Sequence, residues 1–265
     1  MTQPVSKLLF IGDIVGQPAL NYLERRLPAL IASSGADFVV ANAENLEISG
    51  TGAGMTGASL ERLFRAGVQL VTGGNHSWDG PEGSSVHQDP RVLRPLNVAS
   101  ELPGRGAGIL TSSAGIRLGV LNVAGSSAIS GVSSALEAIL RPLERWLEGG
   151  EVDAVLLDLH SESVFEKLGL AYALAGRVAA VLGTHTHVQT RDARVLPGGV
   201  AYVSDVGMTG PAGGMQGYDP AGFVARLKNP DAPQGPLELA HGEVELGAVL
   251  VTFEGSRATE IRRLE

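Results

Sequence analysis

Short apolar runs alternate along this chain with segments that have the apolar pattern of helices. The strand-like runs cover residues 8–11, 37–41, 69–72, 116–123, 154–157, 178–182, 200–204 and 247–253. The helical patterns cover residues 19–32, 59–66, 134–146 and 164–173, and the last of them opens with the capping-box pattern S-V-F-E. Strand–helix–strand alternation favours an α/β layered fold.

The later part of the chain is richer in strands. Residues 249–253 and 258–261, joined by Glu254-Gly255-Ser256, predict a hairpin. This shift indicates two sheets with helices outside them. The Pro-rich stretch 229–236 predicts a surface loop rather than a domain linker, so we expect a single domain over residues 1–265.

Composition narrows the classes of function. The net charge of −8 argues against a broad basic surface for duplex nucleic acid, although it leaves room for a local basic pocket. The hydrophobic fraction of 44% predicts a well-buried core. The chain has no cysteine, which excludes disulfides and thiolate metal sites. Any metal must therefore be held by His, Asp, Glu or Asn.

The first residues of the chain lead directly into a strand-like run. They have neither the charged segment nor the apolar segment of a signal peptide. No apolar run reaches the ~18 residues that a membrane-spanning helix needs. We therefore expect a cytoplasmic protein without a membrane partner.

Five of the strand-like runs end in side chains that can ligate metals. In open α/β sheets, ligands bind just beyond the carboxyl ends of the strands, so these five segments can deliver their side chains to one place. The candidate ligands are Asp13, Glu44, Asn45, Asn75, His160, His185 and His187.

Two of the six histidines stand in the segment G-T-H-T-H, which begins at Gly183. In an extended segment, residues i and i+2 face the same side at roughly 6–7 Å spacing, which suits two neighbouring metal ions. Seven candidate ligands are too many for one tetrahedral site, but they suit two ions that share a carboxylate. Such a site serves phosphoryl-oxygen displacement, and His76 is well placed beside Asn75 to act as the general acid.

Each candidate also has an ordinary structural alternative. Asp13 and Asn75 could cap the segments that follow them, and His160 could be a buried histidine with satisfied hydrogen bonds. Asp158, one pleat before His160, could orient a metal-bound imidazole or have a plain structural role. The metal hypothesis therefore depends on the joint placement of the candidates rather than on any one of them.

Three further residues are left outside the predicted site. Trp78 could stack on a base, but a role in the core is the simpler expectation. His87 and His241 lie in polar segments, and we expect both to be solvated.

The order of the motifs G-D, E-N, G-N-H, H and G-T-H-T-H resembles the calcineurin-like metallophosphoesterases, from about Leu8 to Gly210. That resemblance implies an αββα four-layer sandwich of two mixed sheets flanked by helices, with a dinuclear metal centre. The chain departs from the family pattern in two places. The family commonly has Asp-x-His at the first strand, where this chain has Val15, and a bridging Asp after the second strand, where it has Glu44-Asn45.

Both departures match one bacterial subfamily, the YmdB-like phosphodiesterases that act on 2′,3′-cyclic nucleotides. Four segments of the chain resemble that subfamily: F-I-G-D-I-V-G from Phe10, G-N-H-S-W-D from Gly74, residues 183–190, and S-D-V-G-M-T-G-P from Ser204.

The resemblance implies a role for each candidate. One ion would be held by Asp13, Asn45 and His187, and the other by Asn75, His160 and His185, with Glu44 bridging the two. A metal-bridging hydroxide would attack phosphorus, and His76 would protonate the departing ribose oxygen. Iron or manganese is the metal that the resemblance implies, whereas ligand chemistry alone does not separate these from zinc or nickel.

We therefore predict a two-metal phosphodiesterase that hydrolyses 2′,3′-cyclic nucleotides to nucleoside monophosphates. A phosphomonoesterase or protein phosphatase on the same scaffold is one alternative. An RNA- or nucleotide-binding regulator with weak turnover is another. The expected partner is a small phosphodiester substrate, with RNA and a homo-oligomer left open.

Overall fold

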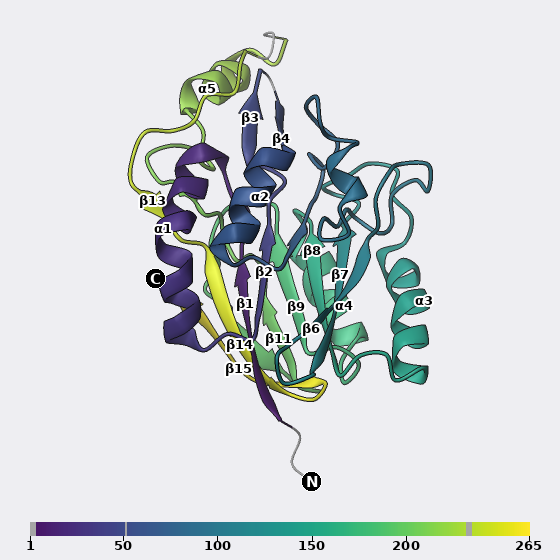
Figure 1. The fold of residues 1–265 in the computed structure, drawn as a ribbon. Coiled ribbons are helices and arrows are strands. Elements are labelled where there is room, and N and C mark those ends of the chain that lie inside the picture. Colours follow the sequence, from purple (N-terminus) through teal and green to yellow (C-terminus); the bar gives the residue numbers. More distant parts are fainter. Residues whose placement is uncertain (1–3, 51, 232–234) are drawn as a thin grey trace.

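The structure is a computed structural model that describes residues 4–50, 52–231 and 235–265. It is a mixed α/β protein in which two larger sheets are accompanied by helices and by two short two-stranded sheets (Figure 1). The α/β class predicted from the alternation of strand-like and helical segments is confirmed.

The five-stranded sheet is built around the N-terminal strand. Its strand order is β15 (Arg257–Leu264), β14 (Ala248–Glu254), β1 (Val5–Ile11), β2 (Phe38–Asn42) and β5 (Leu70–Thr72). Strands β1, β2 and β5 run parallel, so their carboxyl ends lie at the same edge of the sheet. Strand β14 pairs antiparallel with both β1 and β15, which confirms the predicted hairpin.

The six-stranded sheet is formed by the middle of the chain. Its strand order is β10 (Arg194–Leu196), β11 (Val200–Val203), β9 (Ala180–Thr184), β8 (Ala154–His160), β7 (Arg117–Ala124) and β6 (Ala107–Thr111). The four inner strands are parallel, and the two edge strands β6 and β10 are antiparallel to their neighbours.

The remaining elements connect or cover these sheets. The two short sheets pair β3 (Glu47–Ser49) with β4 (Gly52–Gly54), and β12 (Gly210–Pro211) with β13 (Val244–Glu245). The helices are α1 (Gly16–Ser34), α2 (Gly57–Ala66), α3 (Ala135–Glu148), α4 (Val164–Ala173) and α5 (Pro220–Lys228), with a short 3-10 helix η1 (Val86–Gln88). Among the helices of the described residues, none combines the length and the apolar character needed to cross a bilayer.

Three hydrophobic clusters join these elements. The first joins α1 and α2 to the five-stranded sheet, through side chains such as Leu20 and Leu9. The second lies between the two sheets, where Phe10 faces side chains such as Leu156. The third joins the six-stranded sheet to α3 and α4, through side chains such as Leu157 and Trp146. Alternate residues of a strand face opposite sides, so the side chains of β8 contribute to both the second and the third cluster. Both of its faces are therefore buried, which explains why its sequence is a continuous apolar run.

The predicted elements differ from the observed ones mainly at short or exposed segments. The sequence patterns did not indicate the edge strand β6, whose residues are mostly exposed or half-buried. They also missed α5, because none of its residues is fully buried and it therefore lacks a marked apolar stripe. Its start does have a local signal, since Asp219 caps the helix and Pro220 occupies the first turn.

Two local predictions have different outcomes. The Ser163 side chain accepts a hydrogen bond from the Glu166 backbone N–H at the start of α4, which confirms the predicted cap. Residues 232–234 of the predicted loop 229–236 lie outside the described residues, and the described residues on either side of them are in turns or irregular structure.

Candidate metal centre

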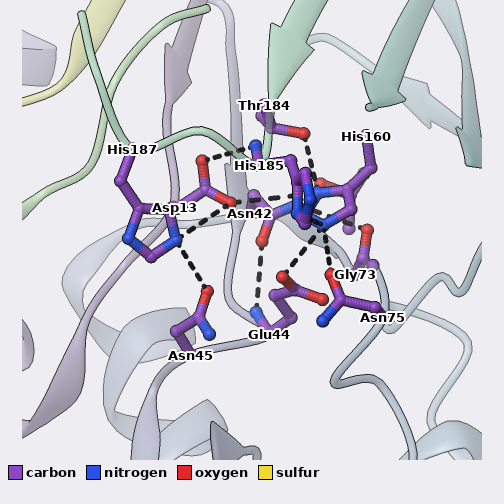
Figure 2. Close-up of polar contacts among 12 residues, drawn as sticks. Asp13, Asn42, Glu44, Asn45, Gly73, Asn75, His160, Thr184, His185 and His187 are labelled. Atoms are coloured by element: carbon purple, nitrogen blue, oxygen red, sulfur yellow. Dashed lines mark hydrogen bonds and ion pairs between the residues drawn. The ribbon is translucent and has the colours of Figure 1, made fainter. Parts of the chain in front are cut away.

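The structure brings the seven candidate ligands together where the strand ends of the two sheets meet (Figure 2). From the five-stranded sheet come the residues that follow β1, β2 and β5, which are Asp13, Glu44, Asn45 and Asn75. From the six-stranded sheet come the last residue of β8 and the loop after β9, which supply His160, His185 and His187. Strand β8 is longer than predicted, so His160 is part of the strand itself.

Four of these residues meet at the outer nitrogen of His160. His160 Nε2 lies 3.0 Å from Glu44 Oε1, 3.0 Å from Asn75 Oδ1 and 2.9 Å from His185 Nδ1. Glu44, His160 and His185 each offer one ligand atom, and these atoms all lie within 4.8 Å of one another. The three residues form a possible metal-binding group.

The other three residues form a second group beside the first. His187 Nε2 lies 3.2 Å from Asn45 Oδ1 and 3.9 Å from Asp13 Oδ1. Asp13 is completely buried, and its Oδ1 has no hydrogen-bond partner among the residues that the structure describes. A buried carboxylate oxygen without a donor is costly, so this atom is suited to a cation. Figure 2 shows Glu44 between this group and the His160 group.

At Gly74, in the loop after β5, the backbone lies so close to these side chains that only glycine fits. A Cβ atom added to Gly74 would collide with His160 Nε2 and Glu44 Oε2. The loop after β5 can therefore approach the cluster only because it carries no side chain at that position. The donor set of carboxylates, amide oxygens and imidazoles suits zinc, iron, manganese or nickel, so the residues present fit a metal centre.

Charges in the cluster are strongly coupled. Burial alone would raise the pKa of Glu44, but the charge and hydrogen bond of His160 outweigh it and bring that pKa to about 2. Burial alone would lower the pKa of His160, but the charge and hydrogen bond of Glu44 and the charge of Asp13 raise it to about 9. Burial and the neighbouring His160 lower the pKa of His185 to about 3. The buried Glu44 carboxylate is thus stabilised by a positive partner, His160, whereas burial raises the pKa of Asp13.

The loop that carries His185 and His187 has an uncommon backbone conformation. Both residues have positive φ angles, 98° and 62°. Side chains other than glycine rarely adopt this region, and such strain persists where the surrounding structure enforces it. The two imidazoles therefore leave the strand end in directions that an extended segment would not give them.

A buried ion pair holds this loop in place. Lys167 Nζ donates to the Thr184 carbonyl oxygen at 2.9 Å and to Asp205 Oδ2 at 3.1 Å. Asp205 Oδ2 also accepts a hydrogen bond from the Thr186 backbone N–H at 3.0 Å. Lys167 and Asp205 are each only 1% exposed. The sequence patterns did not indicate Lys167, because a lysine within a predicted helix is usually solvent-exposed.

Asp158 reaches His160 through a hydroxyl group. Thr184 Oγ1 lies 3.0 Å from His160 Nδ1 and donates to Asp158 Oδ1 at 2.8 Å. Such a partner fixes the orientation of an imidazole and directs its other nitrogen at the ligand site. Of the two roles considered for Asp158, the geometry favours the orienting one, with Thr184 as the intermediary that the sequence patterns missed.

His76 lies at the edge of the cluster rather than within it. Its Nδ1 is 2.8 Å from Asp79 Oδ2, and its side chain is 30% exposed. Its backbone N–H donates to Glu44 Oε2 at 2.9 Å, which ties the loop after β5 to the loop after β2. This position, open to solvent and held by a carboxylate, is compatible with proton transfer to a bound molecule.

A cavity of about 210 Å³ opens above the cluster. Its lining includes predicted site residues, namely Glu44, Asn45, Asn75, His76, His185 and His187. The other lining residues were not predicted from the sequence, and they are Glu162, Gln216, Tyr218, Phe223 and Leu237. Most of these belong to the connection between β12 and β13, where no periodic pattern marks them.

The residues left outside the predicted site lie away from this cavity. Trp78 is half-buried, packs its ring 5.7 Å from that of His87, and donates from Nε1 to the Pro103 carbonyl oxygen. The expectation that His87 is solvated is wrong, because η1 buries it and its Nε2 lies 2.8 Å from the Ser77 carbonyl oxygen. Burial lowers the pKa of His87. His241 is exposed, as expected.

Comparison with known proteins shows that the chain is similar to phosphoesterases. Residues 9–264 match the family model described as YmdB-like protein. The chain is 34% identical over 262 residues to a 2′,3′-cyclic-nucleotide 2′-phosphodiesterase of Bacillus subtilis (strain 168), and the match covers 97% of this chain and 96% of that one.

Two solved structures are similar over nearly the whole chain. A hypothetical protein from Thermus thermophilus has a TM-score of 0.87 and 37% identity, with 96% of each chain covered. A novel phosphatase from Mycoplasma pneumoniae has a TM-score of 0.86 and 27% identity, with 99% of this chain and 93% of that one covered.

Proposed function

Because this chain belongs to the YmdB-like protein family and is a phosphodiesterase, we propose that it hydrolyses 2′,3′-cyclic nucleotides to nucleoside monophosphates at the candidate metal centre. The observation that supports the proposal most is the convergence of buried ligand atoms around His160 and around His187. The substrate is suggested by the name of the Bacillus subtilis relative.

We propose that two metal ions, iron or manganese, bind at this centre. Asp13, Asn45 and His187 would hold one ion, and Asn75, His160 and His185 the other, with Glu44 shared between them. When bound, the ions supply Lewis-acid activation of the phosphodiester and of the attacking water. Asp13 and Glu44 are the only two carboxylates in this ligand set, so a centre with two cations keeps a positive charge that attracts phosphate.

The reaction itself needs a proton donor from the protein. The oxygen of water forms a bond to phosphorus, and the bond between phosphorus and a ribose oxygen breaks. His76 gives a proton to that departing oxygen and regains one from the water that was consumed. Asp79 holds Nδ1 of the His76 ring at 2.8 Å, so the proton transfer is assigned to Nε2 of this cavity-lining residue.

Finer structural and cellular assignments belong to the same proposal. We assign the two sheets and their helices to the four-layer αββα sandwich, supported by the three hydrophobic clusters. A single domain over residues 1–265 and a cytoplasmic location stay predictions, whereas binding of RNA and formation of a homo-oligomer stay open.

Phosphomonoesterase activity is the second candidate, favoured by the similarity to a structure described as a phosphatase. The two candidates use the same centre and differ in whether the bound phosphate carries one ester or two. A phosphodiesterase cleaves bis-p-nitrophenyl phosphate, whereas a monoesterase prefers the mono-ester. A regulator that only binds nucleotides cleaves neither.

The proposal is tested by metal analysis of the purified protein together with a bis-p-nitrophenyl phosphate assay. The assay is repeated after chelation and after iron or manganese is added back. Two metal equivalents per chain and chelator-sensitive diester cleavage are expected, followed by turnover of 2′,3′-cyclic nucleotides. Bound metal without turnover would favour the regulator, and a protein that binds no metal and is rescued by none would overturn the proposal.

A further inference from the structure

The cavity above the candidate metal centre has one wall that phosphate chemistry does not require. This wall is formed by Tyr218, Phe223 and Leu237, two aromatic rings and an aliphatic side chain. Tyr218 is buried, whereas Phe223 and Leu237 are half-buried and keep part of their surface accessible. A phosphate and metal ions gain nothing from contact with apolar side chains, whereas a substrate with a flat apolar part can pack against them.

A second cavity adjoins the first at the same residues. It has a volume of about 220 Å³, and Phe223 and Leu237 line both cavities. We call this second space the outer cavity. Its other lining residues include Asp219, Arg226 and Glu238, which bring hydrogen-bond acceptors and a donor to the apolar surface. A molecule that occupies both cavities must therefore pass against Phe223 and Leu237.

Three aromatic rings lie between the candidate metal centre and the place where the two cavities adjoin, which we call the passage. The His187 and Tyr218 rings lie 6.3 Å apart, and the Tyr218 and Phe223 rings lie 6.1 Å apart, measured between centroids. These distances are within the usual range for packed aromatic side chains. The accessible ring of Phe223 is thus separated from a predicted metal ligand by one buried ring.

Backbone hydrogen bonds hold the two sides of the passage together. The Asp219 N–H donates to the Glu238 carbonyl oxygen at 2.8 Å, which joins the start of α5 to the segment that carries Leu237. The Leu237 N–H donates to the Gly50 carbonyl oxygen at 2.8 Å, which ties the same segment to the β3–β4 sheet. Figure 1 shows α5 at the end of the molecule where these strands lie. These two hydrogen bonds fix the segment that carries Leu237 relative to α5 and to the β3–β4 turn.

We infer that the nucleobase of the substrate binds against Phe223 and Leu237 at the mouth of the outer cavity, while its phosphate lies at the candidate metal centre. This inference rests on the proposed function and names the residues that select a nucleotide over other phosphodiesters. Stacking of a base on an aromatic ring tolerates every base, because each base has a flat π-face. A larger purine gains more contact than a pyrimidine.

The test compares two substrates that differ only in the base. One is 2′,3′-cyclic AMP, and the other is methyl riboside 2′,3′-cyclic phosphate, which has the same ribose and cyclic phosphate without a base. In Phe223→Ala, the ratio of kcat/KM for the first substrate to that for the second should fall about 5- to 100-fold. Phe223→Trp should keep the ratio, because the larger ring also stacks.

Two further measurements separate recognition from folding. Phe165→Ala is the matched control, since Phe165 is 87% exposed on α4 and lies outside both cavities, and its ratio should stay at the wild-type value. Calorimetry with adenosine 3′-monophosphate reports base binding without turnover, and its Kd should rise by a similar factor in Phe223→Ala. Leu237→Ala should lower the ratio less than Phe223→Ala, because it removes no ring.

The outcomes distinguish this inference from the proposed function. A wild-type protein that cleaves 2′,3′-cyclic AMP, together with a Phe223→Ala variant whose ratio and Kd are unchanged, would overturn the inference alone. An equal loss on both substrates would also overturn it, since that result indicates a structural role for Phe223. A wild-type protein that cleaves bis-p-nitrophenyl phosphate but no 2′,3′-cyclic nucleotide would overturn the proposed substrate, and the inference with it.

Discussion

The buried cluster of candidate ligands and the edge of the cavity beside it are built in different ways. In the buried cluster, which we call the floor, Asp13, Glu44, Asn45 and His160 are at most 2% exposed. At the edge, which we call the rim, His76 is 30% exposed and Glu162 is 54% exposed. The rim also includes Phe223 on α5, a helix none of whose residues is fully buried.

The difference follows from what positions each part. Floor residues stand at or directly after strands whose register is set by pairing on both sides, so their side chains have little freedom. Rim residues stand on loops and on a peripheral helix, where changes are tolerated at lower cost. We expect the floor to determine whether metal binds and the rim to determine what is turned over. The substitutions below separate the two parts.

The largest effect is expected for Glu44→Ala on the floor. This carboxylate contacts His160 Nε2 at 3.0 Å and accepts the backbone N–H of His76, and we propose that it bridges both ions. The variant should bind neither ion and should lose diester cleavage entirely, as measured by elemental analysis and by the chelator-sensitive assay. Glu148→Ala removes an exposed carboxylate at the end of α3 and is the control, which should keep both metal equivalents. Loss of a single ion in Glu44→Ala would contradict the bridging role.

The next effect is expected for His76→Ala on the rim. Removal of a general acid typically lowers turnover by roughly 10²–10⁴-fold while leaving substrate binding in place. Metal content should stay at the wild-type level, because His76 lies outside the two groups of ligand atoms. His241→Ala, which replaces an exposed histidine far along the chain, is the control and should behave like the wild type. If His76→Ala lost its metal, the role assigned to His76 would be wrong.

A smaller effect on catalysis but a clear one on folding is expected for Lys167→Met in α4. Removing one partner of a buried ion pair leaves the other charge unpaired and typically costs about 3–5 kcal/mol of the free energy of unfolding. Because Lys167 also holds the Thr184 carbonyl oxygen, the loop with His185 should loosen and metal affinity should fall. Chemical denaturation and chelator competition measure the two effects.

The exposed lysine of α5 provides the control for that variant. Lys228→Met removes the same charge at a surface position and should change the free energy of unfolding by no more than about 0.5 kcal/mol. If Lys167→Met were as stable as Lys228→Met, the ion pair with Asp205 would not be what holds the histidine loop.

The contrast between floor and rim also explains what could be predicted from the sequence. Apolar runs that end in Asp, Glu, Asn or His mark strand ends, and parallel strands bring their ends together, so the convergence of Asp13, Glu44 and His160 was predictable. That these residues ligate metal stays a prediction. The positive φ angles of His185 and His187 were not predictable, because this loop is held by distant residues such as Lys167 and Asp205.

The rim could not be predicted for a different physical reason. Phe223 and Leu237 lie in the connection between β12 and β13, where α5 buries no residue fully and leaves no periodic pattern. His87 shows the same limit elsewhere in the chain. Its polar neighbours indicated a solvated residue, yet η1 packs it against Ser77 and Trp78. In such segments the environment of a side chain is decided by tertiary contacts rather than by local sequence.

The smallest effect is expected for Asp79→Asn, which acts on the rim through His76. Asp79 Oδ2 lies 2.8 Å from His76 Nδ1, but the two side chains are 45% and 30% exposed, so solvent weakens the pair. The variant should lower kcat by roughly 3- to 10-fold and leave metal content unchanged, because a neutral amide still orients the ring but supports its positive charge less. In a His76→Ala background the same substitution should have no further effect. A loss of kcat by roughly 3- to 10-fold in that background would show that Asp79 acts on the fold of the loop rather than on His76. Turnover at the rim would then depend on the structure of the loop as well as on its exposed side chains.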